Sequence, residues 1–293
     1  MRAVFAGERG SFAEAAARAY FGGKTRVDRV PLFEDVFSAA AGDSAVRGVV
    51  PIENTRGGSV HQNYDLLLES GCSIVGEIYL PIRHCLVANP GVNLRRLRRV
   101  LSHPQALAQC RRYLARRKGW TIEETVNTAA AVKRIQDEGS ADAAAVASRQ
   151  AALDFNMEVL AENIQDDQGN TTRFLVVADK PLSKRQLAVK MNRSDERKSS
   201  VKTSIIFSMK NLPGALFKSL AVFSLRDIDL FKIESRPTFG QGFQYLFYLD
   251  FEGSAFSEAQ QNALNHLQEL TVFFRMLGSY PVGRRVGPAH GQG

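Results

Sequence analysis

The stretch "QGNTTRFLVV", residues 168–177, joins a turn, a short polar run and an apolar strand. Gly169-Asn170 is turn chemistry. Residues 174–177 are apolar and partly β-branched, as in a strand of a covered sheet. Between them, at the mouth of the strand, lie Thr171, Thr172 and Arg173. Open α/β sheets present their ligand crevice at strand ends, so these residues are either polar trim or part of a site.

The sequence around this stretch, residues 1–180, alternates strand and helix patterns. "RAVFAG" (2–7), "VRGVVPIEN" (46–54), "RRVLSHP" (98–104) and "ADAAAVAS" (141–148) predict strands. "SVHQNYDLLLE" (59–69), with Ser59 placed to cap it, and "PQALAQCRRYLARR" (104–117) predict helices. "SFAEAAARAYF" (11–21) predicts a helix with Ser11 as N-cap and Glu14 in a capping box. This alternation favours an α/β fold with a largely parallel sheet. The long extended run near residues 74–88, interrupted by Pro81, predicts a crossing between two lobes.

The remainder of the chain divides into three parts. Residues 181–200 are polar, charged and aperiodic, which predicts a linker. Residues 201–281 follow the order strand, helix, strand, strand, helix, strand, a ferredoxin-like βαββαβ unit. The Gly-rich tail, 282–293, is expected to be disordered.

Bulk properties narrow the class of protein. The chain has 293 residues, of which 44% are apolar, enough for two domains. It shows no apolar run of membrane-spanning length and no signal-peptide pattern, so we predict a soluble, cytoplasmic protein. Its cysteines, Cys72, Cys85 and Cys110, form no CxxC pair, which argues against zinc and for a reducing compartment. Cys110 is expected in the core.

The net charge of +8 is concentrated in one segment. Between Pro81 and Trp120 there is no acidic residue, and the basic residues are Arg83, Arg95, Arg96, Arg98, Arg99, Arg111, Arg112, Arg116, Arg117 and Lys118. Such a segment can be a solvated face, a field that steers a small anion, or a nucleic-acid surface. No nucleic-acid motif accompanies it, so we expect no nucleic-acid partner.

Polar clusters recur at the ends of predicted strands. "PIENTRGGSVH" (51–61) offers Glu53, Asn54, Thr55 and Ser59, with Gly57-Gly58 to let backbone approach a ligand and a helix start suited to an anion. "SHPQALAQC" (102–110) begins a helix that is predicted to carry the side chains Gln105, Gln109, Arg112 and Arg116 on one face. Each cluster could instead be an ordinary loop or solvent face. The set holds no nucleophile–base pair, metal cage or dinucleotide fingerprint, which favours cofactor-free chemistry on a small polar anion.

Four motifs resemble prephenate dehydratase when taken in order: "GERGSFAEAAA", "VVPIENTRGGSV", "SHPQALAQC" and "NTTRF". "NLPGALFKSL" and "KIESRP" resemble the ACT regulatory domain that follows it. The resemblance covers roughly residues 1–281. It implies a two-lobed, periplasmic-binding-protein-like catalytic domain (1–180) with substrate in the cleft, an ACT domain (201–281), no cofactor, no membrane, and a homodimer or homotetramer.

The resemblance also implies a reaction, prephenate to phenylpyruvate in L-phenylalanine biosynthesis, and assigns roles. Thr172 is the donor to the leaving hydroxyl, Glu53 is a second candidate for the proton source if it is buried, and Asn54 completes the catalytic set. The substrate-binding candidates are Ser11, Thr55, Gly58, Ser59, Ser102, His103, Gln105, Gln109, Arg173 and Phe174. Arg173 either holds a carboxylate or braces the lobes.

For the second domain, the resemblance implies that L-phenylalanine binds and inhibits. Pro213-Gly214 suits a helix start that can hold a carboxylate, with an apolar wall beside it. The effector candidates are Leu212, Pro213, Gly214, Ala215, Leu216, Glu234, Ser235 and Arg236. Two alternatives stay open: arogenate dehydratase, which performs the same elimination on the amino-acid analogue, and a non-enzymatic small-anion binder.

Overall fold

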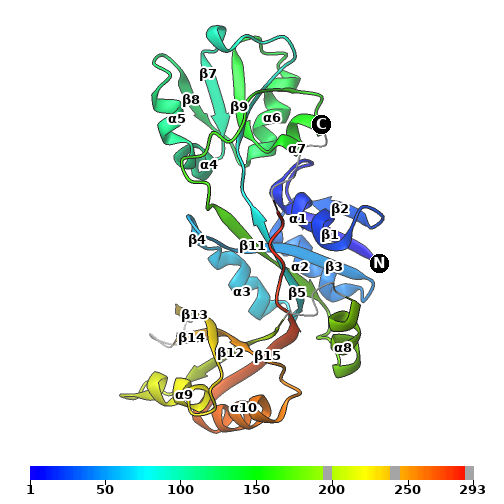
Figure 1. The fold of residues 1–293 in the computed structure, drawn as a ribbon, viewed down its shortest axis with the longest axis vertical. Helices are drawn as coiled ribbons and strands as arrows, with labels where there is room; N and C mark the ends of the chain where they lie inside the picture. Colours follow the sequence, from blue (N-terminus) through cyan, green and yellow to red (C-terminus); the bar gives the residue numbers. More distant parts are fainter. Residues whose placement is uncertain (194–199, 238–244, 288–293) are drawn as a thin grey trace.

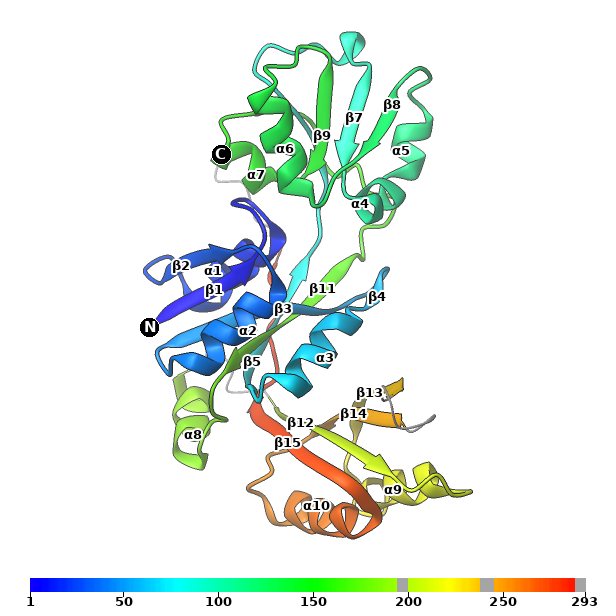
Figure 2. The ribbon, with the colours of Figure 1, turned by 180° about the vertical axis from the view of Figure 1, so that it is seen from behind.

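The computed structural model describes residues 1–193, 200–237 and 245–287, and it is a mixed α/β fold built on separate sheets arranged along its longest axis (Figures 1 and 2). We call these the first, second and third units, each a sheet with its covering helices. Within the described ranges, no helix is both long and apolar enough to cross a bilayer.

The first unit holds the sheet β2-β1-β3-β11-β5, with β4 paired to β3. The strands β1, β2 and β3 are parallel, whereas β11 runs antiparallel to both neighbours, so the prediction of a largely parallel sheet is correct only for the first three. Helix α1 packs on one face, and α2 and α3 pack on the other. The bounds are β1 Arg2–Ala6, α1 Phe12–Phe21, β2 Arg26–Val30, α2 Phe33–Gly42, β3 Val46–Asn54, β4 Gly58–Ser59, α3 His61–Glu69, β5 Ser73–Pro81 and β11 Thr171–Ala178.

The second unit holds the sheet β10-β6-β9-β7-β8, in which β7, β8 and β9 are parallel and β6 and β10 are antiparallel. The small-residue strand β9 is fully buried between helices on both faces, and Cys110 lies in this core as predicted. The bounds are β6 Cys85–Ala88, a 3-10 turn Leu94–Arg96, β7 Arg99–Ser102, α4 Pro104–Gln109, α5 Arg111–Ala115, β8 Thr121–Glu124, α6 Thr128–Asp137, β9 Ala143–Ala147, α7 Arg149–Asp154 and β10 Glu158–Ala161.

The chain crosses between these two units twice. It leaves at the end of β5, enters the second unit at β6, and returns from β10 to β11 (Figure 1). The predicted crossing near Pro81 is therefore confirmed, because β5 and β6 belong to different sheets.

The third unit has the predicted element order and an antiparallel sheet, β13-β14-β12-β15. Helices α9 and α10 cover one face, and the other face packs on the first unit through Ile206, Tyr248 and Leu277. The bounds are β12 Val201–Met209, α9 Ala215–Ser224, β13 Leu230–Pro237, β14 Tyr245–Glu252, α10 Glu258–Leu270 and β15 Thr271–Pro281. The start of the predicted third strand, residues 242–244, lies outside the described residues.

Two segments differ from their predictions. The expected linker contains helix α8, Lys184–Arg193, which is anchored by the buried Leu187 and by Lys190, whose Nζ donates to the Val75 carbonyl at 2.8 Å. The tail was expected to be disordered, but residues 282–286 lie along β5, where Tyr79 N donates to the Arg284 carbonyl and Val286 N donates to the Tyr79 carbonyl. Backbone pairing with an uncovered strand edge orders this segment. Residues 194–199 and 288–293 lie outside the described residues.

Strand β11 sends alternate side chains to opposite faces of the first sheet. Thr172, Phe174 and Val176 face α1 and the second unit, whereas Arg173 and Leu175 face the third unit. This alternation follows from the two-residue period of a strand.

A buried cluster of charges joins the first unit to the third. Arg173 and Lys202 supply two positive charges, and Glu77 and Asp250 supply two negative ones; these side chains are 6%, 4%, 0% and 11% exposed. The hydroxyl of Tyr280 accepts from Arg173 Nη2 at 3.2 Å. The ion pairs are Arg173 Nε–Glu77 Oε2 at 2.7 Å, Arg173 Nη1–Asp250 Oδ2 at 2.6 Å and Lys202 Nζ–Glu77 Oε1 at 2.8 Å.

The cluster is electrically balanced, which is the condition for burying charge at tolerable cost. Burial alone raises the pKa of a carboxyl, but Arg173 and Lys202 outweigh that effect and hold the pKa of Asp250 below its ordinary value. We refer to Arg173, Glu77, Lys202 and Asp250 as the interface cluster.

We predict that Arg173→Ala lowers the free energy of unfolding by about 3–5 kcal/mol, because it leaves buried carboxylates without their partner. Urea denaturation followed by circular dichroism measures this. Arg149→Ala removes an exposed ion pair with Glu162 and is the matched control, expected to change stability by less than about 1 kcal/mol. Equal effects of the two substitutions would contradict the role of the interface cluster.

Candidate functional site

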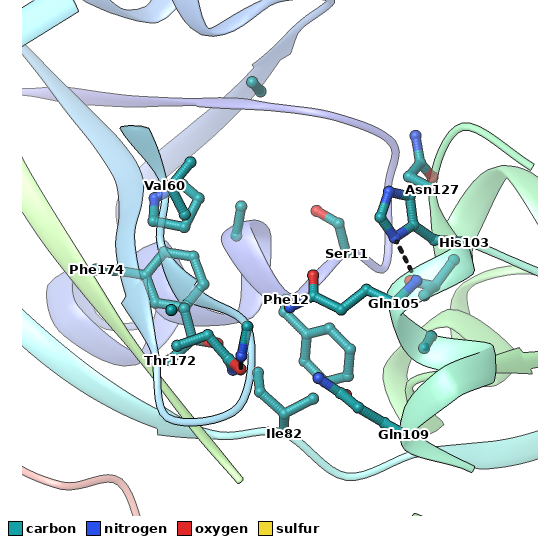
Figure 3. Close-up of a pocket in the computed structure, with 18 of the residues that line it drawn as sticks. Ser11, Phe12, Val60, Ile82, His103, Gln105, Gln109, Asn127, Thr172 and Phe174 are labelled. Carbon is teal, nitrogen blue, oxygen red and sulfur yellow. Dashed lines mark hydrogen bonds between the residues drawn. The ribbon is translucent and has the colours of Figure 1, made fainter. Parts of the chain in front are cut away.

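A cavity of about 500 Å³ lies between the first and second units (Figure 3). This volume falls in the range of roughly 300–1,000 Å³ typical of small-molecule sites. Side chains from both units meet across it: Thr172, Phe174 and Val60 on one side, and His103, Gln105 and Gln109 on the other (Figure 3). Of the predicted site residues, it is lined by Ser11, Asn54, Gly58, Ser59, His103, Gln105, Gln109, Thr172 and Phe174.

The cavity is suited to an anion although its wall offers no charged side chain as an ion-pair partner. Among the described residues that line it, none is Asp, Glu, Lys or Arg. Instead, helices α1, α3 and α6 begin at its wall, with their N-caps Ser11, Val60 and Asn127 in the lining. Helix N-termini carry partial positive charge and free N–H groups, so they stabilise a bound anion.

The Thr172 hydroxyl is oriented by Asn54. Asn54 Nδ2 donates to Thr172 Oγ1 at 2.8 Å, and its Oδ1 accepts from the backbone N–H groups of Arg56 and Gly57 at 2.9 and 2.7 Å. Since the Thr172 oxygen accepts from Asn54, its own proton is left to donate elsewhere. The arrangement makes Thr172 a preset hydrogen-bond donor, 8% exposed, at the cavity wall.

The turn after Asn54 contains two glycines, of which Gly57 lies close to the second unit. A Cβ on Gly57 would lie 1.8 Å from Gln105 Nε2, so a side chain here would displace the Gln105 amide from its position. Gly58 has φ of 75°, a left-handed conformation that side chains disfavour. Ser59 was predicted to cap α3, but it lies in β4, and its hydroxyl donates to Glu234 Oε2 at 2.6 Å.

The predicted helix at 104–117 is broken at Cys110 into α4 and α5. Asp166, in the returning crossing, causes the break: its N–H donates to the Gln109 carbonyl at 2.7 Å, and its carboxylate accepts from Arg112 N at 3.0 Å. Gln105 and Gln109 consequently reach the cavity, whereas Arg112 and Arg116 do not line it.

Glu53 lies on the wrong face for the role of proton source. A β-bulge pairs Glu53 with Arg173 and Pro51 with Phe174, so one extra residue, Ile52, shifts the alternation. Pro51 lacks a backbone N–H, and proline within sheets occurs at bulges. The Glu53 carboxylate therefore points away from the cavity, 3.0 Å from Lys232 Nζ of the third unit.

Three further predicted residues lie outside the cavity lining. Arg173 belongs to the interface cluster, where it pairs with Glu77 and Asp250 and braces the first unit against the third, not against the second. Ser102 is fully buried, with its hydroxyl donating to the Val146 carbonyl at 2.6 Å. Thr55 Oγ1 accepts from Thr171 N at 3.0 Å and secures the turn to β11.

Some lining residues were missing from the predicted set. His84, in the outgoing crossing, is 2% exposed, and burial lowers the pKa of its imidazole. Its Nε2 lies 2.9 Å from Gln109 Oε1, and the Phe12 ring packs edge-on against it. Asn127 and Thr128 start α6. Asn127 is recognisable from sequence as an N-cap, but only the fold brings it to the cavity.

A smaller cavity, about 220 Å³, lies at the start of α9 in the third unit. Of the predicted effector residues, Leu212, Gly214, Ala215 and Leu216 line it. Helix α9 begins at Ala215, with Gly214 as a left-handed N-cap, so Pro213 precedes the helix instead of occupying its first turn. Glu234 and Arg236 face the first unit, where they contact Ser59 and Asp65. Ser235, between them on β13, is exposed.

These features define the class: an α/β protein with a small-molecule cavity between two units, lined by hydroxyl, amide and imidazole side chains. Residues 3–182 match the family model of prephenate dehydratase. Arogenate dehydratase/prephenate dehydratase 2, chloroplastic, of Arabidopsis thaliana is 47% identical over 293 residues, covering 96% of this chain and 73% of that protein. The chain belongs to the prephenate dehydratase family, and it is an enzyme of the carbon–oxygen lyase class.

Two solved structures have the same fold over nearly the whole chain. Prephenate dehydratase from Arthrobacter aurescens, in complex with L-Phe, has a TM-score of 0.83 and 29% identity, covering 97% of this chain and 90% of that one. GqqA, described as a novel type of quorum quenching acylase, has a TM-score of 0.85 and 28% identity, covering 97% and 98%.

We predict that Glu53→Gln leaves the shape of the pH–kcat profile unchanged and lowers kcat/KM by less than about tenfold, because its carboxylate pairs with Lys232 and not with substrate. Steady-state kinetics between pH 5 and 9 provide the measurement. Loss of one limb of the profile together with a fall in kcat of about 100-fold or more would restore Glu53 as a proton source.

Proposed function

We propose that the cavity between the first two units converts prephenate to phenylpyruvate, carbon dioxide and water. The observation that carries this proposal is the Thr172 hydroxyl, which accepts from Asn54 and so presents its proton to an uncharged cavity. Prephenate is a dianion, and the N-termini of α1, α3 and α6 supply the positive potential that its carboxylates need.

The proposed reaction needs a hydrogen-bond donor at the C4–oxygen bond of prephenate. The C4–oxygen bond breaks, the ring carboxylate leaves as CO2, and the electrons of its carbon–carbon bond complete the aromatic ring. Hydroxide is a poor leaving group, so it must be hydrogen-bonded as it departs and take up a proton to become water. A threonine hydroxyl is too weak an acid to transfer its proton outright, but as an oriented donor it stabilises the developing charge.

Exclusion of water from the cavity favours the loss of the ring carboxylate as CO2. Phe12, Phe174 and Ile82 contribute apolar surface to the cavity. Closure of the two units over the substrate would desolvate the ring carboxylate and favour its loss as neutral CO2. The units meet at the contact of Gln105 with the Gly57 turn, and also where Ser148 Oγ donates to the Gly10 carbonyl at 2.7 Å.

Arogenate is the alternative substrate, since curated relatives such as arogenate dehydratase 2 of Petunia hybrida, 45% identical, carry that name. A binder without activity is the other alternative, and the similarity to a named acylase shows that one fold can carry another chemistry. Purified protein is therefore assayed with prephenate and with arogenate, following phenylpyruvate and phenylalanine. Turnover of neither would leave only the binder.

We further infer that the third unit is an ACT-type regulatory domain that binds L-phenylalanine. The L-Phe complex of the Arthrobacter enzyme supports this inference. The cavity at α9 offers a helix N-terminus for a carboxylate and an apolar wall of Leu212, Leu216 and Phe247 for a ring.

Strand β13 provides a route from this domain to the catalytic turn. It alternates exposed residues with residues that contact the first unit, close to Asn54. The contacts are Lys232 Nζ–Glu53 Oε1 at 3.0 Å, Ser59 Oγ–Glu234 Oε2 at 2.6 Å and Arg236 Nη2–Asp65 Oδ2 at 2.8 Å. A shift of β13 on effector binding would move the turn that orients Asn54.

We also propose a homo-oligomer, a dimer or a tetramer, formed through the third unit. Large apolar side chains there are exposed in the single chain, and among them Leu212, Leu216 and Phe217 line one cavity. Phe217 and Leu212 are 76% and 62% exposed, and apolar surface of this kind marks protein interfaces. A second copy could also bring the exposed Ser235 to the effector cavity of its partner. A cytoplasmic location remains a prediction, since several relatives are named chloroplastic.

We predict that Thr172→Val lowers kcat by roughly 10²–10⁴-fold with little change in KM, because the donor to the leaving group is lost while the shape is kept. Thr171→Val is the matched control, since the Thr171 hydroxyl donates to the Gly169 carbonyl and lies outside the cavity lining. A near-normal kcat in a folded Thr172→Val variant would contradict the role of Thr172 as donor to the leaving hydroxyl.

We predict that L-phenylalanine inhibits the full chain, with a coupling of about 1–3 kcal/mol, and that Lys232→Ala/Arg236→Ala binds it but is inhibited less. Calorimetry measures binding, and initial rates measure inhibition. Lys218→Ala, on the exposed face of α9, is the control. Undiminished inhibition of the double variant would contradict the β13 route.

Analytical ultracentrifugation tests the proposed oligomer. A chain that sediments as a monomer both with and without phenylalanine would contradict it.

A further inference from the structure

Asn170 links the two walls of the cavity without lining it. It is the last residue of the returning crossing and is 1% exposed. Its Oδ1 accepts from Asn54 Nδ2 at 2.8 Å, and its Nδ2 donates to Gln109 Oε1 at 2.8 Å. Its carbonyl accepts from Ile82 N, in the outgoing crossing, at 2.9 Å. One carboxamide thus joins the first unit, the second unit and both crossings.

The backbone turn after Asn54 fixes which groups donate and which accept in this series of hydrogen bonds. Asn54 Oδ1 accepts from the backbone N–H groups of Arg56 and Gly57, and backbone N–H groups cannot reverse. Asn54 Nδ2 must therefore donate, to Thr172 and to Asn170. Because Asn170 accepts on its oxygen, its nitrogen is turned to Gln109, which must in turn accept on Oε1.

The consequence is that both walls present donors. The Thr172 proton is free because its oxygen accepts from Asn54. Gln109 Oε1 also lies 2.9 Å from His84 Nε2, which therefore carries the proton of that ring, while His84 Nδ1 has no hydrogen-bond partner among the described residues. With its oxygen engaged twice, Gln109 is left to offer its Nε2 amide group to the cavity that it lines (Figure 3).

We propose that Asn170 is a positioning residue, which transmits the donor direction set by the turn at residues 54–57 to Gln109 and couples that residue to Thr172 across the cavity. This proposal rests on the proposed function. The consequence for the substrate, an anion that carries a leaving hydroxyl, is that it meets the Thr172 O–H on one wall and the Gln109 N–H on the other. An amide that donates on one side and accepts on the other is the only neutral side chain of this size that completes the chain.

Asn170→Asp separates the two halves of this role. The carboxylate still accepts from Asn54, so Thr172 keeps its orientation, but it cannot donate to Gln109. The Gln109 amide then rotates so that its Nε2 donates to the new carboxylate. Its Oε1 then faces the cavity, where it repels the substrate anion. We expect KM at pH 8 to rise roughly 10–100-fold, the value of a hydrogen bond to a charged group, with kcat within about threefold. The KM defect should shrink toward pH 5, because a protonated carboxyl regains a donor.

Two further variants frame the measurement. Asn170→Ser is too short to reach both neighbours, so it should lower kcat and raise KM at every pH, and it tests the same coupling if Asn170→Asp does not fold. Asn93→Asp adds the same charge at an exposed N-cap of the second unit and should match the wild type within about twofold. Thermal unfolding followed by circular dichroism confirms that each variant is folded.

The outcomes are distinct. Wild-type KM in Asn170→Asp at pH 8, a fall in kcat as large as the rise in KM, or a KM defect that does not diminish at acidic pH would each overturn the role of Asn170 while leaving the proposed function in place. Wild-type kinetics in Asn170→Ser would do the same. Absence of turnover of prephenate and arogenate by the wild-type chain would overturn both.

Discussion

The interface cluster is the constraint on which the arrangement of the molecule depends. Burying two carboxylates, a guanidinium and an ammonium costs several kcal/mol per ion, and only near-complete mutual pairing offsets that cost. The pairing requires β11 and β5 of the first unit to meet β12 and β14 of the third in one register. Because Thr172 precedes Arg173 on β11, the third unit also fixes the position of the Thr172 hydroxyl from the opposite face of the sheet.

The cavity works by the direction of its hydrogen bonds more than by charge. A backbone turn after Asn54 sets the orientation of that amide, and the orientation passes to Thr172 on one side and through Asn170 to Gln109 on the other. Helix N-termini add potential without a formal charge. In the proposed reaction, such a site would hold an anion without neutralising its donors, which would stay available to the charge that develops on the leaving oxygen.

Sequence patterns predicted the elements well where local chemistry decides. Ser11 caps α1 as expected, β9 is the buried small-residue strand, and the crossing at Pro81 is present. The capping box is only half formed, because the Glu14 carboxylate accepts from Gly10 N, while Ser11 N donates to the Glu8 carbonyl. What could not be predicted depends on non-local contacts: the β-bulge that turns Glu53 away, the break that Asp166 makes after Gln109, and the pairing of the tail with β5. Pro51 within a strand was the one local sign of the bulge. The resemblance placed Arg173 in the cleft, but strand alternation points it to the third unit.

A crystal structure of the protein with an unreactive, ring-reduced dicarboxylate analogue of prephenate tests the central claim most directly. The account predicts that the analogue lies between the two units, with its C4 hydroxyl within about 3 Å of Thr172 Oγ1, its carboxylates at Gln109 and at helix N-termini, and Arg173 still buried in the interface cluster. An analogue bound by Arg173 or Glu53, or one whose hydroxyl contacts a different donor than Thr172, would contradict it.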